Sequence, residues 1–409
     1  MRFITDFLYL VTVLLTSPIW FTRMVWRGRL RTDWRGRFGH AAHSSKEPCQ
    51  RLLFHAVSVG EVNALRSLVL GLEEIEGLDV VIATTTDTGF KRATELYGCR
   101  HQIVRYPLDF SWAVGRFLKR IRPTAVALVE LEVWPNFVAA CRRGNIPIAV
   151  VNGRLSERSY SRYRLVRFLL RPSFRRLSWV GCQTEEYAAR FEGMGCEVDR
   201  IEVTGSMKWD NTALPLEGAE QLAIELGIDA DKPLIVAGST APEEHKLLHE
   251  ATPEGVQLLC APRRPEWFEE ASRVMVGCAR RTENKVGSET GRFLLDTIGE
   301  LSHAYLLADL VVIGRSFGNR HGSDVSEPVG RGKPVVVGPA VADFQDMVDE
   351  LVQAGGIIQC DRESLAGELN RLLDDQQARS EVAANGQKVL EIRQGASSRT
   401  QSHLLQLMK

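Results

Sequence analysis

The stretch LLFHAVSVGEVNALRSLVLGLEEI, residues 52–75, contains the pattern that decides the fold. Residues 52–57 form a short apolar run of strand length, and residues 62–75 form a segment of helix length. A buried strand followed directly by a helix is typical of a parallel sheet that helices cover on both faces. The stretch therefore predicts an α/β fold.

The same alternation continues along the chain and restarts after residue 208. We expect further strands at residues 80–84, 125–130, 146–151, 179–183, 234–238, 257–261, 310–314 and 335–338. A chain of 409 residues is also too long for one ordinary core, so we predict two Rossmann-like halves. Ligands of such sheets bind at the carboxyl ends of the strands, and the cleft between two such domains is the natural site.

The composition excludes several classes of protein. Equal numbers of basic and acidic side chains, 51 of each, argue against a general nucleic-acid-binding surface. The eight cysteines are scattered, form no C-x-x-C pair and have no histidine at zinc-ligand spacing. We therefore expect reduced, buried thiols in a cytosolic environment, with no metal site.

The first 38 residues differ from the rest of the chain. An apolar segment at residues 3–21, interrupted by Asp6, precedes the six arginines Arg23, Arg27, Arg29, Arg31, Arg35 and Arg37. A cleaved signal peptide would need small residues at a cleavage site, which this segment lacks, and a buried core helix is the simplest alternative. We favour a membrane anchor or an interfacial helix, with the body of the protein in the cytoplasm.

Three polar motifs follow expected strands. HAVSVGEV at residues 55–62 places Glu61 in the first turn of a helix, and ATTTDTG at 83–89 places hydroxyl groups where a strand meets a helix. ELEVWPN at 130–136 places two carboxylates on one face of an extended segment. Each motif alone also has a purely structural explanation, since glutamate, threonine and proline are all common at helix starts.

In this order, the three motifs resemble those of the 3-deoxy-D-manno-octulosonic acid (Kdo) transferases of lipopolysaccharide synthesis. The resemblance covers nearly the whole chain. Further matches are NGRLSERS at residues 152–159, QTEE at 183–186, VTGSMK at 203–208, AGST at 237–240, PRRP at 262–265, DTIGEL at 296–301 and SEP at 326–328. The resemblance implies a GT-B fold, in which two Rossmann-like domains with parallel sheets face each other across a central cleft.

The resemblance also implies a reaction. Kdo would move from CMP-Kdo to a hydroxyl of a lipid A precursor, with inversion at the anomeric carbon and without a metal or other cofactor. Glu61 would be the general base, and Glu130 and Glu132 would hold the acceptor or stabilise positive charge. The other candidates, expected to bind substrate, are Ser58, Gly60, Thr86, Arg154, Lys208, Ser239, Arg263, Arg264, Gly299, Ser316, Ser323, Asp324 and Glu327.

We expect three segments: an anchor with its basic flank at residues 1–38, an acceptor domain at 39–209, and a nucleotide-sugar domain at 210–409. The final helix of the last segment is expected to pack back on the acceptor domain. Some positions depart from the family's usual motifs, and they affect the choice of donor sugar. They are Ala241, Arg264, Arg315, Ser323 and Asp324.

A basic stretch at residues 154–176 carries eight arginines and one glutamate, with apolar residues between them. It suits a membrane surface or a phosphorylated lipid, although arginine stems also cover ordinary surface helices. We therefore expect the protein at the cytoplasmic face of the inner membrane. Two other functions stay open: a GT-B transferase that uses another CMP- or UDP-activated sugar, and a non-catalytic two-domain sugar-binding protein.

Overall fold

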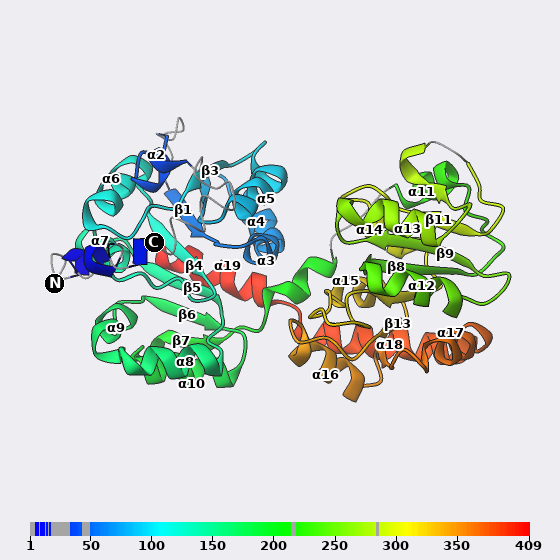
Figure 1. Cartoon of the computed structure of the whole chain (residues 1–409). Coiled ribbons are helices and arrows are strands. Elements are labelled where there is room, and N and C mark those ends of the chain that lie inside the picture. Colours follow the sequence, from blue (N-terminus) through cyan, green and yellow to red (C-terminus); the bar gives the residue numbers. More distant parts are fainter. Residues whose placement is uncertain are drawn as a thin grey trace. The chain divides into compact units, whose positions relative to one another are not determined.

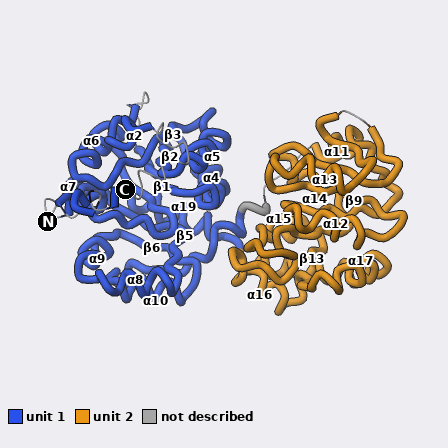
Figure 2. Tube along the Cα trace, viewed as in Figure 1, with its two compact units in different colours: residues 1–210, 394–409 blue, residues 211–393 orange. Residues whose placement is uncertain are grey.

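The computed structural model describes residues 5–7, 9–12, 14, 16–17, 33–42, 50–213, 218–283 and 286–409. The chain forms two compact units (Figure 2). Unit 1 comprises residues 1–210 and 394–409, and unit 2 comprises residues 211–393. Both units contain a parallel sheet with helices, so the prediction of two parallel α/β halves is confirmed.

In the described part of unit 1, seven parallel strands form one sheet in the order β3-β2-β1-β4-β5-β6-β7. The strands are β1 Gln50–His55, β2 Leu78–Thr84, β3 Gln102–Arg105, β4 Ala125–Val129, β5 Ile148–Gly153, β6 Trp179–Cys182 and β7 Ile201–Val203. The helices are α2 Trp34–Arg37, α3 Val59–Ala64, α4 Arg66–Glu73, α5 Asp87–Tyr97, α6 Ser111–Ile121, α7 Pro135–Arg143, α8 Glu157–Leu165, α9 Arg167–Phe174, α10 Glu185–Met194 and α19 Ala396–Leu407 (Figure 1).

Strand β4 shows why the central strands read as continuous apolar runs. All five of its side chains are buried. Val126 and Leu128 pack in the core formed with α6, α7 and α10, whereas Ala125 and Ala127 pack in the core formed with α3, α4 and α19. Because successive side chains point to opposite faces, a strand with helices on both faces must be apolar throughout.

Unit 2 repeats this architecture. Among its described residues, seven parallel strands follow the order β10-β11-β9-β8-β12-β13-β14. They are β8 Leu234–Thr240, β9 Gln257–Pro262, β10 Ala279–Arg280, β11 Arg292–Leu294, β12 Leu310–Ile313, β13 Val335–Val337 and β14 Ile358–Gln359. The helices are α11 Ala219–Leu226, α12 Pro242–Ala251, α13 Phe268–Val274, α14 Leu301–Leu307, α15 Ser326–Gly330, α16 Gln345–Gln353, α17 Leu365–Asp374 and α18 Gln376–Arg393.

Each sheet has one topological switch point, where the strand order reverses. In unit 1 this point lies between β1 and β4, which pair in register from Leu52 with Ala125 to His55 with Leu128. In unit 2 it lies between β8 and β12. The loops that leave these strands diverge there and open a crevice in which ligands of α/β proteins bind.

The last helix, α19, returns to unit 1 after α18 has completed unit 2. The carboxylate of Asp210 accepts hydrogen bonds from the backbone N–H groups of Gly395 (2.7 Å) and Ser397 (2.6 Å), at the start of α19. A carboxylate at this end of a helix is favoured by the helix dipole. Asp210, the last residue of segment 1–210, therefore holds the start of segment 394–409, which contains α19.

The N-terminal residues are described only in part. Those placed between positions 5 and 17 are helical. Asp6 accepts hydrogen bonds from the Ser111 backbone N–H (2.9 Å) and the Asn136 side-chain amide (2.8 Å), and the Tyr9 hydroxyl donates to Asp109 (2.9 Å). Within the described ranges, no helix is long and apolar enough to cross a membrane, so the predicted anchor is not confirmed. Arg23, Arg27, Arg29 and Arg31 lie outside those ranges.

The switch point of unit 2 yields a stability prediction. A methyl group at Gly314 would lie 2.4 Å from the Cα atom of Thr240, so Gly314→Ala should destabilise unit 2 by about 1–3 kcal/mol. Gly367 lies in α17 of the same unit, and a methyl group there would meet nothing within 4 Å. Gly367→Ala should therefore be neutral or stabilising in the same urea-unfolding experiment. Equal effects of the two substitutions would contradict the close approach of these backbones.

Candidate active site

Glu61 lies in the first turn of α3, directly after β1, and its side chain is buried, with 9% of the residue exposed. The Val57 backbone N–H donates to its Oε2 atom at 2.7 Å, and the Ser58 hydroxyl donates to its Oε1 atom at 2.8 Å. Burial raises the pKa of Glu61 to about 7, in opposition to these hydrogen bonds, which lower it. A carboxyl group with this pKa can take up and release a proton near neutral pH.

Glu130 and Glu132 follow β4, the neighbour of β1 at the switch point. Both carboxylates repel the charge of Glu61 and so contribute to its raised pKa. Glu132 accepts a hydrogen bond from the Trp134 indole N–H at 2.7 Å, and burial also raises its pKa. The structure therefore gathers all three predicted catalytic carboxylates at one end of the sheet of unit 1.

Thr86 connects the first motif to the second. Its hydroxyl donates to the Val57 carbonyl at 2.6 Å and accepts from the Gly89 backbone N–H at 3.0 Å, at the start of α5. A methyl group at Gly89 would lie 2.7 Å from the same carbonyl, so the two loops are in direct contact. Gly60, by contrast, is exposed, and a methyl group there would meet only the Ser58 hydroxyl, at 3.9 Å.

The two predicted basic residues of unit 1 lie along the same edge. Arg154 follows β5 and is half-buried, and its backbone N–H donates to the Glu130 carbonyl at 3.4 Å. Lys208 lies half-buried in the 3₁₀ helix η3, Met207–Ala213. The Met207 backbone N–H donates to the Asn152 side chain at 3.0 Å, which holds η3 against the end of β5. Both cations thus lie at the carboxyl end of the sheet that carries Glu61.

The predicted donor-binding residues of unit 2 also follow the carboxyl ends of its strands. Ser239, at the end of β8, is buried and has a positive φ of 57°. Arg263 and Arg264 are exposed after β9, and the Arg264 guanidinium lies 5.1 Å from the Trp267 ring centroid. Gly299, before α14, has a φ of 107° that favours glycine.

Ser316 and Ser323 are both buried, but their environments differ. The Ser316 hydroxyl donates to the Ile313 carbonyl at 2.6 Å and accepts from the Gly338 backbone N–H at 2.8 Å, so it organises its own loop. The Ser323 hydroxyl has no hydrogen-bond partner in the described part of the chain. Ser323 is therefore the one of the two whose hydroxyl is still able to bind a ligand.

Asp324 and Glu327 lie at the start of α15. Asp324 accepts hydrogen bonds from the Ser326 backbone N–H at 2.9 Å and the Ser326 hydroxyl at 2.6 Å, and Ser302 donates its hydroxyl proton to Glu327. Asp324, Glu327 and Arg263 all interact electrostatically with Tyr305, whose pKa burial raises well above its usual value. Residues that are distant in sequence thus gather around one side chain.

Sequence reasoning missed Glu244, a fully buried residue in the first turn of α12. Its Oε1 atom accepts from the backbone N–H groups of Ser316 (2.8 Å) and Phe317 (2.9 Å), and its Oε2 atom accepts from those of Ala241 (2.9 Å) and Arg315 (2.7 Å). It therefore joins the loops that leave β8 and β12, across the switch point. The sequence did offer one signal for Glu244: like Glu61, it lies in the first turn of a helix that follows a strand.

Comparison with solved structures defines the class of protein. UDP-GlcNAc 2-epimerase from Neisseria meningitidis, bound to UDP-GlcNAc, matches 87% of this chain and 100% of its own, with a TM-score of 0.59 and 14% identity. This likeness shows the fold alone, and it places the chain among two-domain proteins of GT-B-like architecture.

Comparison of sequences defines the family. Residues 32–211 match the model of the 3-deoxy-D-manno-octulosonic-acid transferase (kdotransferase) family. The chain is 34% identical over 345 residues to 3-deoxy-D-manno-octulosonic acid transferase of Bordetella pertussis, covering 79% of each protein. It is 27% identical over 400 residues to the Haemophilus influenzae transferase, covering 93% of this chain and 92% of the relative. The chain belongs to the Kdo transferase family.

The raised pKa of Glu61 predicts a pH-dependent change in stability. Folding raises this pKa from 4.5 to about 7, so the resulting stabilisation is complete below pH 4.5 and is lost as the pH rises through about 7. Glu61→Gln removes this titration, so its stability relative to the unmodified protein should increase by about 2 kcal/mol between pH 5 and pH 8. Urea unfolding at both pH values measures this difference.

The matched control is Glu185→Gln, which changes an exposed glutamate in the first turn of α10. Because its side chain is exposed, this substitution removes no buried carboxyl group. If Glu61→Gln and Glu185→Gln give the same dependence, Glu61 does not titrate near neutral pH.

Glu244 yields a second prediction for the site. Glu244→Gln places an NH₂ group against two of the four buried N–H donors and leaves them unsatisfied, which should destabilise unit 2 by at least about 2 kcal/mol. The neighbouring Glu243 is exposed and forms an ion pair with Arg320 at 2.6 Å. Glu243→Gln should therefore cost less than about 1 kcal/mol in the same urea-unfolding experiment. Similar losses in both variants would contradict the role assigned to Glu244.

Proposed function

We propose that this protein is an inverting glycosyltransferase that transfers Kdo from CMP-Kdo to a hydroxyl group of a lipid A precursor. Membership of the Kdo transferase family supports the sugar and the reaction class. The observation that carries the mechanism is the buried Glu61 carboxyl group, whose pKa is about 7. A general base is most effective when its pKa is close to the working pH.

In the proposed reaction, Glu61 takes the proton from the acceptor hydroxyl as that oxygen bonds to the anomeric carbon of Kdo. The bond between this carbon and the CMP phosphate oxygen breaks, and CMP leaves with the electron pair. Attack from the face opposite the leaving group inverts the anomeric centre. Glu130 and Glu132 provide negative charge beside Glu61, which favours the positive charge of an oxocarbenium-like transition state.

We assign donor binding to unit 2. Arg263 and Arg264 are exposed cations at the carboxyl end of β9, suited to the phosphate and the sugar carboxylate of CMP-Kdo. Glu327 is suited to the ribose hydroxyls, and Ser323 offers an unsatisfied hydroxyl. The proposed reaction requires no metal or other cofactor, because these side chains would hold the charged groups of the donor.

We also propose that the enzyme works at the cytoplasmic face of the inner membrane. Support comes from exposed apolar residues on the N-terminal helical segment and around the junction of α8 and α9, which are Phe7, Leu10, Leu14, Leu165, Phe168 and Leu169. Arginines on α8 and α9, such as Arg164 and Arg167, would add attraction to anionic headgroups. We infer that these residues lie on the membrane and give access to a lipid acceptor.

A different nucleotide-sugar donor is the second candidate. Arg315 has a positive φ of 62° and interacts electrostatically with Arg263, Arg264 and Arg320. This concentration of positive charge would also suit the two adjacent phosphate groups of a UDP-sugar, in place of the single phosphate and the carboxylate of CMP-Kdo.

The direct test is incubation with CMP-Kdo and tetraacylated lipid A precursor, followed by mass measurement of the lipid. We expect the lipid to gain the mass of Kdo. Glu61→Gln should lower the rate by about 10²–10⁴-fold, because the proton acceptor is lost. It should leave CMP binding unchanged, because Glu61 lies in unit 1 and the proposed donor site lies in unit 2.

Thermal shifts with CMP and UDP distinguish the two donors, since only the correct nucleotide should stabilise unit 2. A lipid of unchanged mass, together with tight binding of CMP, would indicate a non-catalytic binding protein. Full activity of Glu61→Gln would remove Glu61 from the mechanism.

A further inference from the structure

A cavity of about 500 Å³ lies in unit 1, at the end of the strands opposite to the one where Glu61 lies. Its lining residues are Arg142, Arg175, Arg176, Ser178, Glu197 and Arg200. They lie at the end of α7, at the end of α9 and before β6 and β7, hence at the amino ends of the strands. Because the strands are parallel, the cavity is separate from the candidate active site, which lies at their carboxyl ends.

The charges in this cavity are unbalanced. Arg200 forms an ion pair with Glu197 at 2.6 Å and also donates to the Leu177 carbonyl at 3.2 Å. The guanidinium groups of Arg142, Arg175 and Arg176, by contrast, form no hydrogen bond or ion pair with any side chain in the described ranges. Three unneutralised cations therefore line one cavity.

Helix dipoles account for only part of this arrangement. Arg142 lies in the last turn of α7 and Arg175 caps α9, and a cation at the end of a helix gains about 0.3–1 kcal/mol. That gain is available to arginines that point into open solvent. It does not explain why arginines from two different helices line the same cavity, where their charges repel one another.

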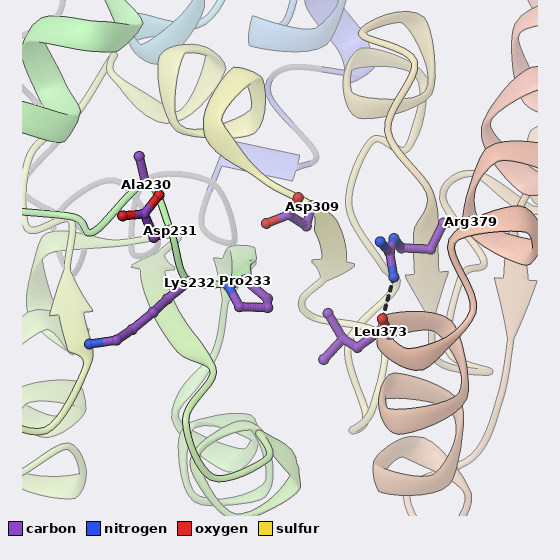
Figure 3. Close-up of a pocket in the computed structure, with 7 residues that line it drawn as sticks. All are labelled: Ala230, Asp231, Lys232, Pro233, Asp309, Leu373 and Arg379. Carbon is purple, nitrogen blue, oxygen red and sulfur yellow. Dashed lines mark hydrogen bonds between the residues drawn. The ribbon is translucent and has the colours of Figure 1, made fainter.

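A cavity of unit 2 provides a contrast (Figure 3). It measures about 230 Å³ and is lined by Lys232, Asp309 and Arg379, among others. Arg379 donates to the carbonyl of Leu372 at 2.7 Å and to that of Leu373, and Lys232 pairs with Asp229 at 3.1 Å. Its cations are already satisfied by the protein, whereas those of the arginine-lined cavity are not.

We propose that the arginine-lined cavity of unit 1 is a binding site for a phosphate group, carried by an anionic lipid headgroup or free in solution. Arginine is the side chain best suited to phosphate, because its planar fork of N–H donors matches the phosphate oxygens. The Ser178 hydroxyl accepts from the Ile148 backbone N–H at 3.2 Å and so keeps its own proton for a ligand.

The size of the cavity and its neighbours suit a headgroup. A volume of about 500 Å³ is larger than one phosphate ion requires. On α9, the exposed Phe168 precedes Arg175 by seven residues, or about 10 Å of helix. Helix α9 could therefore contact lipid chains through Phe168 and a phosphate group through Arg175. This inference does not depend on the proposed sugar transfer.

The test compares adjacent arginines of the full-length protein. Arg142 lines the cavity, whereas Arg143, also exposed and in the same last turn of α7, does not. Binding to vesicles of phosphatidylglycerol and phosphatidylcholine is measured by co-sedimentation. Arg142→Gln should weaken binding about fivefold, and Arg143→Gln should weaken it less than twofold. The triple substitution R142Q/R175Q/R176Q should have a larger effect than R142Q alone.

A second arm uses inorganic phosphate, with CMP present to occupy the proposed donor site. Phosphate should raise the melting temperature of the unmodified protein more than chloride of equal ionic strength does. R142Q should reduce this difference, R143Q should preserve it, and the triple substitution should abolish it. Loss in both arms indicates a headgroup site, and loss in the phosphate arm alone indicates a site for free phosphate. Equal behaviour of R142Q and R143Q in both arms would overturn the proposal, and this comparison holds even if the triple variant does not fold.

Discussion

The burial of the Glu61 carboxyl group is the physical constraint on which this account of the enzyme depends. Transfer of a carboxylate from water to a protein interior is costly, and the cost appears as a raised pKa. Within the described part of the chain, two donors offset this cost, the Val57 N–H and the Ser58 hydroxyl. Glu130 and Glu132 increase it further. The fold thus maintains a carboxyl group that binds its proton more strongly than an exposed glutamate does, so that it exchanges this proton near neutral pH.

Glu244 shows how the same position in the other sheet serves a different purpose. Both glutamates lie in the first turn of the helix that follows a strand beside the switch point. Glu61 accepts one backbone N–H hydrogen bond, whereas Glu244 accepts four. Four donors satisfy both carboxylate oxygens of Glu244, which thereby joins the loops that follow β8 and β12. The two buried glutamates therefore differ in how many backbone N–H groups they accept hydrogen bonds from.

The sequence predicted the parts of the fold in which every residue of an element is apolar. Strands such as β4 and β12 stand out because helices cover both of their faces. The short strands β3, β7, β10, β11 and β14 were missed, since segments of two to four residues with polar members carry too little pattern. One helix expected at residues 62–75 is divided at Leu65 into α3 and α4, where no glycine or proline marks the break.

For the candidate site, the motifs located the loops but not the contacts within them. The sequence pointed to Glu61, Glu130 and Glu132, and the structure brings their charges together. It could not reveal that Thr86 is bonded to the Val57 carbonyl or that Ser316 is occupied by its own loop, because both depend on which strands are neighbours. Tertiary pairing of loops was therefore the missing information.

The most direct measurement of the central claim is the pH dependence of kcat/KM for Kdo transfer, between pH 5 and pH 9. If Glu61 is the base with a pKa of about 7, kcat/KM rises about tenfold per pH unit below pH 7 and becomes constant above it. A rate that stays constant down to pH 5 would show that the group removing the proton ionises at much lower pH, and would contradict the account.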